Sequence, residues 1–275
     1  MMPHTICYIT KKNNNFAKNY RLNKVELNYY MDWQQRTILQ IGLDGQNRLK
    51  NSKILLLGCG GVGASCAEFL ARAGVGNITI VDGDKVNTSN INRQLCALNS
   101  TIGKLKTQVT KDRLLDINPL AKIDIISEYV KDARMQEIIL SDNWDYIVDA
   151  IDTLSPKVYL LYYAIINEYK IISSMGAGGR FNPELVKVVD VADSFNCQLA
   201  SAIRKKLHKL NIFTGFKVVF SPEFVDKKNL IITNDELNKK SIVGTVSYMP
   251  ALFGLHCAST VIRDLLEENT VNKQA

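Results

Sequence analysis

Short apolar runs alternate with longer stretches of helical periodicity along residues 53–175. The runs are rich in Ile, Leu and Val and lack strict alternation with polar residues, which is typical of strands buried on both faces of a parallel sheet. We expect strands at 53–57, 77–81, 123–126, 146–148 and 171–172, with helices at 62–73, 104–117, 132–140 and 156–169. Alternating strands and helices build βαβ units, so the sequence predicts an α/β fold with a doubly wound, mostly parallel, Rossmann-like sheet.

The pattern changes after the Gly-rich segment at 176–179. From there we expect strands at 186–190 and 216–220, a basic helix near 199–210, a polar stretch at 226–240 and an apolar helix near 249–267. We interpret 31–270 as one domain, in which 53–175 form a nucleotide-binding core and 176–270 a substrate-side extension. A tail at 271–275 follows.

Composition narrows the class of protein. The chain has 275 residues, 46% of them apolar, and no apolar run reaches the roughly 20 residues that a membrane-spanning helix needs. Lys and Arg outnumber Asp and Glu by 34 to 27, a net charge of +7. The six cysteines include no C-x-x-C pair and follow no secretory leader, so we expect reduced thiols in a cytoplasmic protein that binds no membrane.

Residues 1–30 differ from the rest of the chain, because five basic residues stand there against a single acidic one and no long apolar run occurs. Such a segment does not predict a folded element. Two interpretations stay open: a flexible leader, or an artefactual stretch before a true start at Met31, where a helix-like run at 32–39 follows. An organellar transit peptide is the weaker interpretation, since the segment holds only one Arg.

Four glycines follow the first predicted strand: Gly58, Gly60, Gly61 and Gly63. Backbone N–H groups at the start of a helix attract an anion, and glycine lets a phosphate approach the main chain closely. Asp82 ends the next strand, at the spacing where a carboxylate reaches a ribose hydroxyl. The pattern predicts an adenine-nucleotide site, but it leaves open a dinucleotide for hydride transfer or ATP for adenylation.

Charged residues further along favour ATP. Attack on an α-phosphate builds negative charge on the phosphoryl group and on the departing pyrophosphate, so an adenylating site needs fixed cations such as Arg93 and Lys106. Asp149 and Asp152 end a predicted strand, and a carboxylate such as Asp152 can hold Mg²⁺ that keeps phosphate ligands. Each residue alone also fits a solvated charge or a helix cap, whereas their joint order points to polyphosphate chemistry.

The order of these motifs resembles the ThiF/MoeB family of ubiquitin-activating-type adenylating enzymes. The motifs are GCGGVG at 58–63, DGD at 82–84, SNINRQ at 89–94, GKLK at 103–106 and DAID at 149–152. The resemblance implies that Asp82 holds the ribose and that Asn90 and Arg93 hold the phosphates. It implies Lys106 at the α-phosphate and Asp152 on Mg²⁺, so that Arg93, Lys106 and Asp152 are the catalytic candidates. The implied ATP-binding set is Gly58, Gly60, Gly61, Gly63, Asp82, Asp84, Ser89, Asn90, Asn92, Arg93, Lys106, Asp152 and Thr153.

Later segments are similar to the tRNA threonylcarbamoyladenosine dehydratases within that family. The segments are SMGAGGRFNP at 174–183, AIRKKL at 202–207, KVVFSPE at 217–223 and GTVSYMP at 244–250. The similarity implies ATP-dependent cyclisation of threonylcarbamoyladenosine in tRNA through an acyl adenylate, with release of AMP and pyrophosphate. It also implies a homodimer and, as in some relatives, a monovalent cation and a sulfur-relay partner protein. The sequence NCQLA at 196–200 departs from the family's acidic D-P-L-A run.

Cysteine spacing separates this chain from many sulfur-carrier-activating relatives, which hold zinc with two C-x-x-C pairs. This chain has no such pair, so we expect no zinc. Cys197 is the only cysteine in 180–240, where some relatives carry a nucleophile, and no His partner is identifiable. We therefore expect Cys197 to be a packing thiol.

The resemblance implies that RNA meets a basic face near the nucleotide cleft, and the densest basic cluster of the body provides the candidates, because lysine and arginine contact phosphates. These residues are Arg204, Lys205, Lys206 and Lys209. A solvated helix face explains their charge equally well without the resemblance. Three rival functions stay open: adenylation of the C-terminus of a ubiquitin-like sulfur-carrier protein, NAD-dependent oxidoreduction, and nucleotide sensing by a scaffold.

Overall fold

The computed structural model describes residues 33–232 and 241–267, so the predictions for the leader 1–30 and the tail 271–275 lie outside the described residues. The chain divides into two compact units, 1–47 and 48–275. Helix α3 (Gln35–Asn51) begins in the first unit and is interrupted at Gly42, where φ is +74°. Glycine adopts this left-handed conformation without steric cost, which explains why it stands at the kink.

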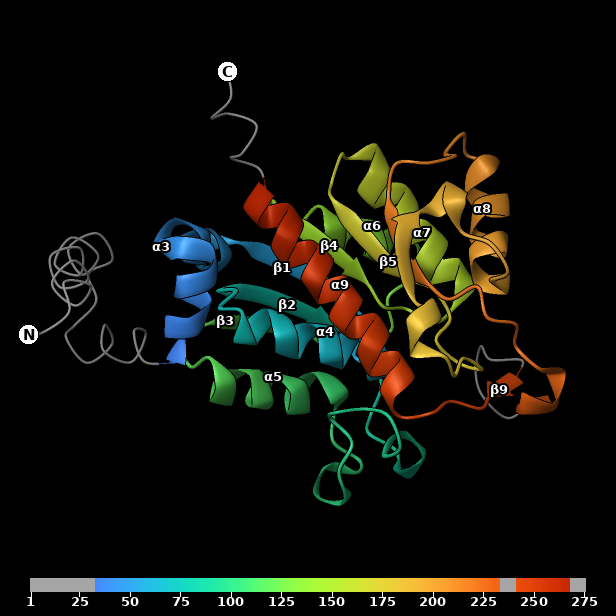
Figure 1. The fold of residues 1–275 in the computed structure, drawn as a ribbon, viewed down its shortest axis with the longest axis horizontal. Helices are drawn as coiled ribbons and strands as arrows, with labels where there is room; N and C mark the ends of the chain where they lie inside the picture. Colours follow the sequence, from blue (N-terminus) through green and yellow to red (C-terminus); the bar gives the residue numbers. More distant parts are fainter. Residues whose placement is uncertain (1–32, 233–240, 268–275) are drawn as a thin grey trace, which may run out of the picture. The chain divides into compact units, whose positions relative to one another are not determined.

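A seven-stranded sheet forms the centre of the second unit, with the strand order β3-β2-β1-β4-β5-β7-β6 (Figure 1). Every strand except β6 runs parallel to its neighbours, and β6 pairs antiparallel with β7. The strands are β1 (Lys53–Leu57), β2 (Asn77–Val81), β3 (Lys122–Ile126), β4 (Tyr146–Asp149), β5 (Ile171–Ser174), β6 (Lys187–Asp190) and β7 (Lys217–Phe220). The predicted doubly wound sheet is confirmed. Its strand order reverses between β1 and β4, where a ligand site is expected outside the carboxyl ends.

Helices cover both faces of this sheet. On one face α4 contacts α5 and α9, and on the other α7 contacts α6 and α8. The helices are α4 (Gly61–Arg72), α5 (Lys106–Ile117), α6 (Asp132–Ile139), α7 (Leu154–Ile166), α8 (Gln198–His208) and α9 (Tyr248–Glu267). Right-handed crossovers explain the division, because β1-β2-β3 and β4-β5 advance in opposite directions from the centre.

The central strand β1 shows why the apolar runs of this sequence are continuous. Leu55 and Leu57 lie in the core that α6, α7 and α8 close, while Ile54 and Leu56 are equally buried on the opposite face. Successive strand residues point to opposite faces, so a strand covered on both sides needs apolar residues at every position. Each such side chain stabilises the fold by about 1.5–3 kcal/mol through burial.

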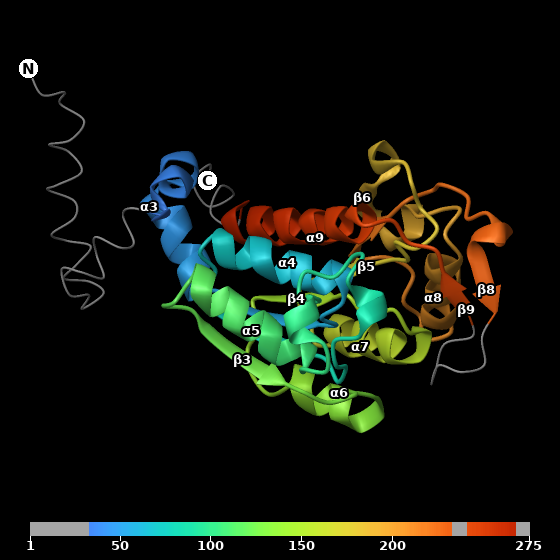
Figure 2. The same cartoon turned by 90° about the horizontal axis from the view of Figure 1, so that it is seen from below.

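Helix α9 packs along α4, and both views show the two helices side by side (Figures 1 and 2). The two helices approach closely at Gly254, where a Cβ would lie 2.4 Å from the carbonyl oxygen of Val62 and 2.9 Å from the backbone nitrogen of Cys66. Only glycine allows this contact. The apolar helix predicted near 249–267 therefore packs across the sheet, on the helix that follows β1.

The polar stretch predicted at 226–240 contains more structure than its composition indicated. Strand β8 (Leu230–Ile232) pairs antiparallel with β9 (Ser241–Val243) in a separate ladder. Five 3₁₀ turns complete the described part: η1 (Thr88–Asn90), η2 (Asn99–Thr101), η3 (Pro183–Leu185), η4 (Val191–Asp193) and η5 (Lys227–Asn229). Across 33–232 and 241–267, no helix combines the length and the apolar character that crossing a bilayer requires.

Candidate active site

The glycine loop, residues 58–63, joins the carboxyl end of β1 to α4. Gly58 has a φ of +92°, and a Cβ there would lie 2.6 Å from the carbonyl oxygen of Ala150, just beyond β4. A Cβ on Gly63 would lie 1.7 Å from the carbonyl oxygen of Gly58. A Cβ on Gly61 would lie 2.8 Å from the carbonyl oxygen of Arg93. The loop therefore closes tightly only with glycine, and the N–H groups that begin α4 stand at the carboxyl edge of the sheet.

Asp82 ties this loop to the neighbouring strand β2. Its carboxylate accepts hydrogen bonds from the backbone N–H of Cys59 at 2.6 Å and of Asp84 at 2.7 Å. Burial raises the pKa of Asp82 above its ordinary value, while Lys106 and the two N–H donors oppose the rise. Each carboxylate oxygen can accept a second hydrogen bond, so Asp82 keeps capacity for a ribose hydroxyl.

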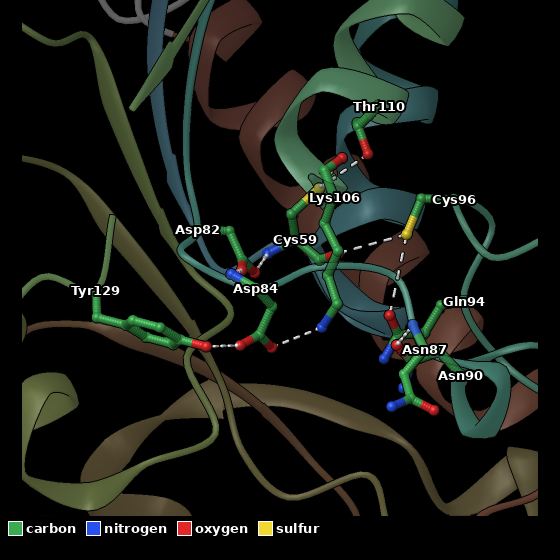
Figure 3. Close-up of polar contacts among 10 residues, drawn as sticks. All are labelled: Cys59, Asp82, Asp84, Asn87, Asn90, Gln94, Cys96, Lys106, Thr110 and Tyr129. Atoms are coloured by element: carbon green, nitrogen blue, oxygen red, sulfur yellow. Dashed lines mark hydrogen bonds and ion pairs between the residues drawn. The ribbon is translucent and has the colours of Figure 1, made fainter. Parts of the chain in front are cut away.

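Lys106 brings a cation to the same edge (Figure 3). It is the first residue of α5 and is buried, and its Nζ lies 2.7 Å from Oδ2 of Asp84. The backbone N–H of Lys106 also donates to the carbonyl of Asp84, at 3.0 Å. The hydroxyl of Tyr129 donates to Oδ1 of Asp84 at 2.5 Å. One carboxylate thus joins the predicted Lys106 to a tyrosine that the sequence analysis did not select.

The turn at 87–94 holds the predicted polar residues of the SNINRQ motif. A capping box fixes it, because the side chain of Asn87 accepts from the N–H of Ser89 at 3.1 Å and that of Asn90 accepts from the N–H of Asn87 at 3.0 Å. Nη1 of Arg93 donates to the carbonyl of Ser89 at 2.9 Å and to the side chain of Asn92 at 2.7 Å. The guanidinium is therefore held by its own turn.

Two contacts bring this turn to the glycine loop and to the start of α9. The side-chain nitrogen of Gln94 would lie 3.8 Å from a Cβ on Gly60. The amide of Asn92 donates to the carbonyl of Thr245 at 3.0 Å, shortly before α9 begins. Segments far apart in the sequence thus converge at the carboxyl edge of β1.

The carboxylate that ends β4, Asp149, and the one three residues beyond it, Asp152, have different surroundings. Asp149 and Lys157 are both completely buried, with their charged atoms 2.7 Å apart, and the hydroxyl of Ser173 donates to Asp149 at 2.6 Å. Burial raises the pKa of Asp149, while Lys157 and Ser173 oppose the rise. Asp152 is exposed and directly precedes Thr153, the N-cap residue of α7. Asp149 therefore belongs to the core, and only Asp152 presents its side chain to solvent.

A metal would have to be held largely by the nucleotide. Among the described residues, no group of three or more His, Cys, Asp or Glu side chains is arranged to hold a metal ion. Mg²⁺ uses one or two protein carboxylates and keeps phosphate and water oxygens. A single exposed carboxylate, Asp152, fits a Mg²⁺ of that kind.

The structure does not bring the basic cluster to the glycine loop. Its four members lie in the last turns of α8 or just after it, where the chain leads into the amino end of β7: Arg204, Lys205, Lys206 and Lys209. The guanidinium of Arg204 donates to the carbonyl of Val191 at 3.4 Å and to the hydroxyl of Ser194. The three lysines are exposed. The glycine loop instead follows the carboxyl end of β1, so it lies at the opposite ends of the strands.

The cysteines near these segments are buried. Cys197 precedes α8 with 5% of its surface exposed and packs in the core under α7 and α8. Cys59, inside the glycine loop, lies 2.9 Å from the hydroxyl of Thr110, and burial raises the pKa of its thiol far above the ordinary value. A reactive cysteine needs an exposed thiolate, so neither thiol suits nucleophilic catalysis.

Two residues that the sequence analysis did not select, Tyr129 and Lys157, could have been found from their positions relative to the predicted strands and helices. Tyr129 stands shortly after β3, at the edge where every motif residue lies. Lys157 is an isolated charge in an otherwise apolar stretch of α7, one turn beyond its start. A buried lysine needs a carboxylate, and the nearest buried candidate in the sequence is Asp149.

Comparison with known proteins gives consistent matches over most of the chain. The ThiF family model matches residues 34–275. The tRNA threonylcarbamoyladenosine dehydratase of Bacillus subtilis (strain 168) is 34% identical over 245 residues, which cover 86% of this chain and 96% of the relative. The Haemophilus influenzae protein of the same name is 33% identical over 237 residues, covering 82% and 90%. The crystal structure of E. coli tRNA N6-threonylcarbamoyladenosine dehydratase, TcdA, in complex with ATP superposes with a TM-score of 0.80 at 27% identity, covering 90% of this chain and 98% of that one.

Proposed function

The chain belongs to the ThiF family, and from this premise we propose that it is an ATP-dependent tRNA threonylcarbamoyladenosine dehydratase. Such an enzyme closes the threonylcarbamoyl group of a tRNA adenosine into a ring, with net loss of water. The bacterial relatives that carry this name match most of this chain and most of their own length. The ATP complex of the E. coli structure supports ATP as the substrate of the glycine-loop site.

The position of Lys106 is the structural observation on which the proposal depends. Its ammonium is buried beside Asp84. The carboxylate of Asp82 accepts from the N–H of Asp84 and from the N–H of Cys59 in the glycine loop, so it connects the two segments. A buried cation beside the N–H groups that begin α4 stabilises negative charge that develops on a transferred phosphoryl group, whereas hydride transfer builds no such charge on phosphate. The arrangement therefore favours adenylation over an NAD-dependent reaction.

In the first step, a carboxylate oxygen of the threonylcarbamoyl group attacks the α-phosphorus of ATP. The bond from that phosphorus to the bridging oxygen breaks, and pyrophosphate leaves with the electron pair. The N–H groups of the glycine loop and the side chains of Arg93 and Lys106 stabilise the negative charge that develops. Asp82 orients the ribose, and the hydrogen bonds of Arg93 to Ser89 and Asn92 restrict its guanidinium before the substrate arrives.

Asp152 would hold Mg²⁺, in keeping with its exposed position at the end of β4. When bound, Mg²⁺ supplies electrostatic stabilisation of phosphate charge. Asp149 cannot take this role, because Lys157 and Ser173 hold its Oδ2 and the backbone N–H of Ile151 holds its Oδ1 in the core.

In the second step, an atom of the same modified nucleoside attacks the acyl carbon, and AMP leaves. Both reacting groups belong to one nucleoside, so the step is effectively unimolecular and needs no covalent enzyme intermediate. The burial of Cys59 and Cys197 agrees with this route.

The proposal extends to partners and setting. Lys205, Lys206 and Lys209 would contact tRNA phosphates away from the reacting nucleoside, since they lie at the edge of the sheet opposite the glycine loop. Arg204 instead holds the turn before α8. We further propose a cytoplasmic homodimer; a monovalent cation and a sulfur-relay partner follow from the family resemblance alone. Adenylation of a ubiquitin-like sulfur-carrier protein is the alternative, because it would use the same ATP residues.

Exchange of radiolabelled pyrophosphate into ATP decides between these substrates. We expect Mg²⁺-dependent exchange with tRNA that carries threonylcarbamoyladenosine, and none with a sulfur-carrier protein ending in Gly-Gly. Mass spectrometry of the tRNA nucleosides should show that ring closure lowers the nucleoside mass by about 18 Da, the mass of one water molecule. Exchange with the carrier alone, or no pyrophosphate release with any acceptor, would refute the proposal.

Two variants test the assigned roles. Arg93→Ala and Lys106→Ala should each lower exchange by about 10²–10³-fold, the usual cost of removing a group that stabilises transition-state charge. Circular dichroism should show an unchanged fold. Wild-type turnover in both variants would refute these roles.

A further inference from the structure

Tyr129 stands out because its side chain is 76% exposed and yet makes a short hydrogen bond at the site. Its hydroxyl reaches Oδ1 of Asp84, while Oδ2 of the same carboxylate holds Lys106 (Figure 3). No motif of the sequence analysis includes this tyrosine. Its ring lies against Gly83, where a Cβ would come within 2.8 Å of the Tyr129 Cγ. The chain therefore leaves room for the ring at the end of β2.

We propose that Tyr129 is a positioning residue: its hydroxyl fixes the carboxylate of Asp84, which in turn fixes the ammonium of Lys106 for binding the phosphates of ATP. The inference adds to the proposed function and depends on it for the role of Lys106. Tyr129 itself touches no reacting atom in this scheme.

Asp84 is the more exposed member of its ion pair with Lys106. The side chain of Lys106 is 7% exposed and that of Asp84 is 42% exposed. A half-exposed carboxylate turns freely unless both oxygens are held, and a lysine loses its fixed direction if its partner turns. The hydroxyl of Tyr129 holds Oδ1 while Lys106 holds Oδ2, which narrows the positions that the ammonium takes before ATP binds.

The hydroxyl can donate throughout the physiological range of pH. The hydrogen bond to Asp84 and partial burial raise the pKa of Tyr129 to about 12. Asp82 and Asp84 both oppose ionisation of the phenol. Tyr129 therefore remains a donor.

A rival role is direct contact of the exposed ring with the nucleotide, and a double-mutant cycle separates the two. Calorimetric titration would measure the dissociation constant of ATP for the wild type, Tyr129→Phe, Asp84→Asn and the double variant. Loss of a hydrogen bond to a charged group predicts ATP binding weaker by about tenfold or more in Tyr129→Phe. In the Asp84→Asn background the same change should have less than about a twofold effect on the dissociation constant, because the Tyr129–Asp84–Lys106 relay is already broken.

Tyr169→Phe is the matched control, since its hydroxyl also makes one hydrogen bond, to the carbonyl of Asp142 at 3.1 Å, before the amino ends of β4 and β5. It should bind ATP as the wild type does. In pyrophosphate exchange, Tyr129→Phe should raise the KM for ATP and leave the KM for tRNA unchanged, which general loosening of the fold would not do.

Three outcomes are decisive. Tyr129→Phe that binds ATP like Tyr169→Phe overturns the inference. An equal loss of affinity in the wild-type and Asp84→Asn backgrounds also overturns it, and favours direct contact. Coupled losses of ATP affinity in a protein that exchanges no pyrophosphate with modified tRNA would support the relay and refute the proposed function.

Discussion

Removing the cation from the buried Asp149–Lys157 pair should strongly destabilise the protein. Neither side chain is exposed, and Nζ of Lys157 also donates to the carbonyl of Ile151 at 2.9 Å. Lys157→Met keeps most of the volume, so the loss is mainly electrostatic. An uncompensated buried charge costs about 3–5 kcal/mol. Domains are stable by only about 5–15 kcal/mol, so the free energy of unfolding should fall by a large fraction.

The loss should depend on pH. Burial raises the pKa of Asp149, and Lys157 is its main opposing influence, so the variant should raise that pKa further. An acid whose pKa is higher in the folded than in the unfolded state binds more protons when folded, and stability then falls as pH rises between the two values. The loss of unfolding free energy caused by Lys157→Met should therefore be smaller at pH 5 than at pH 7, because a neutral Asp149 tolerates burial.

Urea unfolding followed by circular dichroism at both pH values measures this effect. Lys53→Met is the matched control, because the Lys53–Asp142 pair has the same separation of 2.7 Å but side chains 43% and 40% exposed. It should cost less than about 1 kcal/mol. The double variant Lys157→Met/Asp149→Asn should recover part of the loss. The reasoning fails if Lys157→Met is no more costly than Lys53→Met, or if its deficit is the same at pH 5.

Two further predictions concern binding. Gly63→Ala would place a Cβ 1.7 Å from the carbonyl oxygen of Gly58 and should abolish ATP binding in calorimetry. Gly176→Ala is the control, because no atom lies within 4 Å of the new Cβ, and it should bind ATP normally. Equal affinities of the two variants would contradict the loop geometry. Joint replacement of Lys205, Lys206 and Lys209 by Ala should raise the KM for tRNA and leave the KM for ATP unchanged. The slope of log KM for tRNA against log salt concentration should fall by up to about 3. An unaltered salt dependence would exclude phosphate contacts at these lysines.

The central sheet was predictable because its strands are buried on both faces. A run such as 53–57 is apolar throughout and is closed by glycine, so burial and turn signals agree on one element. The ladder of β8 and β9 was missed because the apolar part of β8 is three residues long inside a polar stretch. The length of α3 was also missed, since Gly42 breaks its periodicity.

The candidate site was predictable where motif order reflects position at one edge of the sheet. Glycine spacing and Asp82 identified the loop, and the structure confirms that they meet through the N–H of Cys59. Residue type and spacing alone did not separate Asp149 from Asp152, and only the family resemblance selected Asp152; the structure distinguishes them by the burial of Asp149 and its partner Lys157. Tyr129 was missed because its one signal, a position shortly after β3, belongs to no motif and follows no spacing rule.

The packing of α9 on α4 has a consequence for how the molecule is made. The glycine loop and the first turn of α4 leave the ribosome long before residues 248–267 do. Until then the surface of α4 around Cys66, which Gly254 later covers, is open to water. A nascent chain that stalls in between already contains every nucleotide motif, yet it lacks the helix against which α4 is seated. The packing surface of α4 is therefore complete only once residues 248–267 have been made.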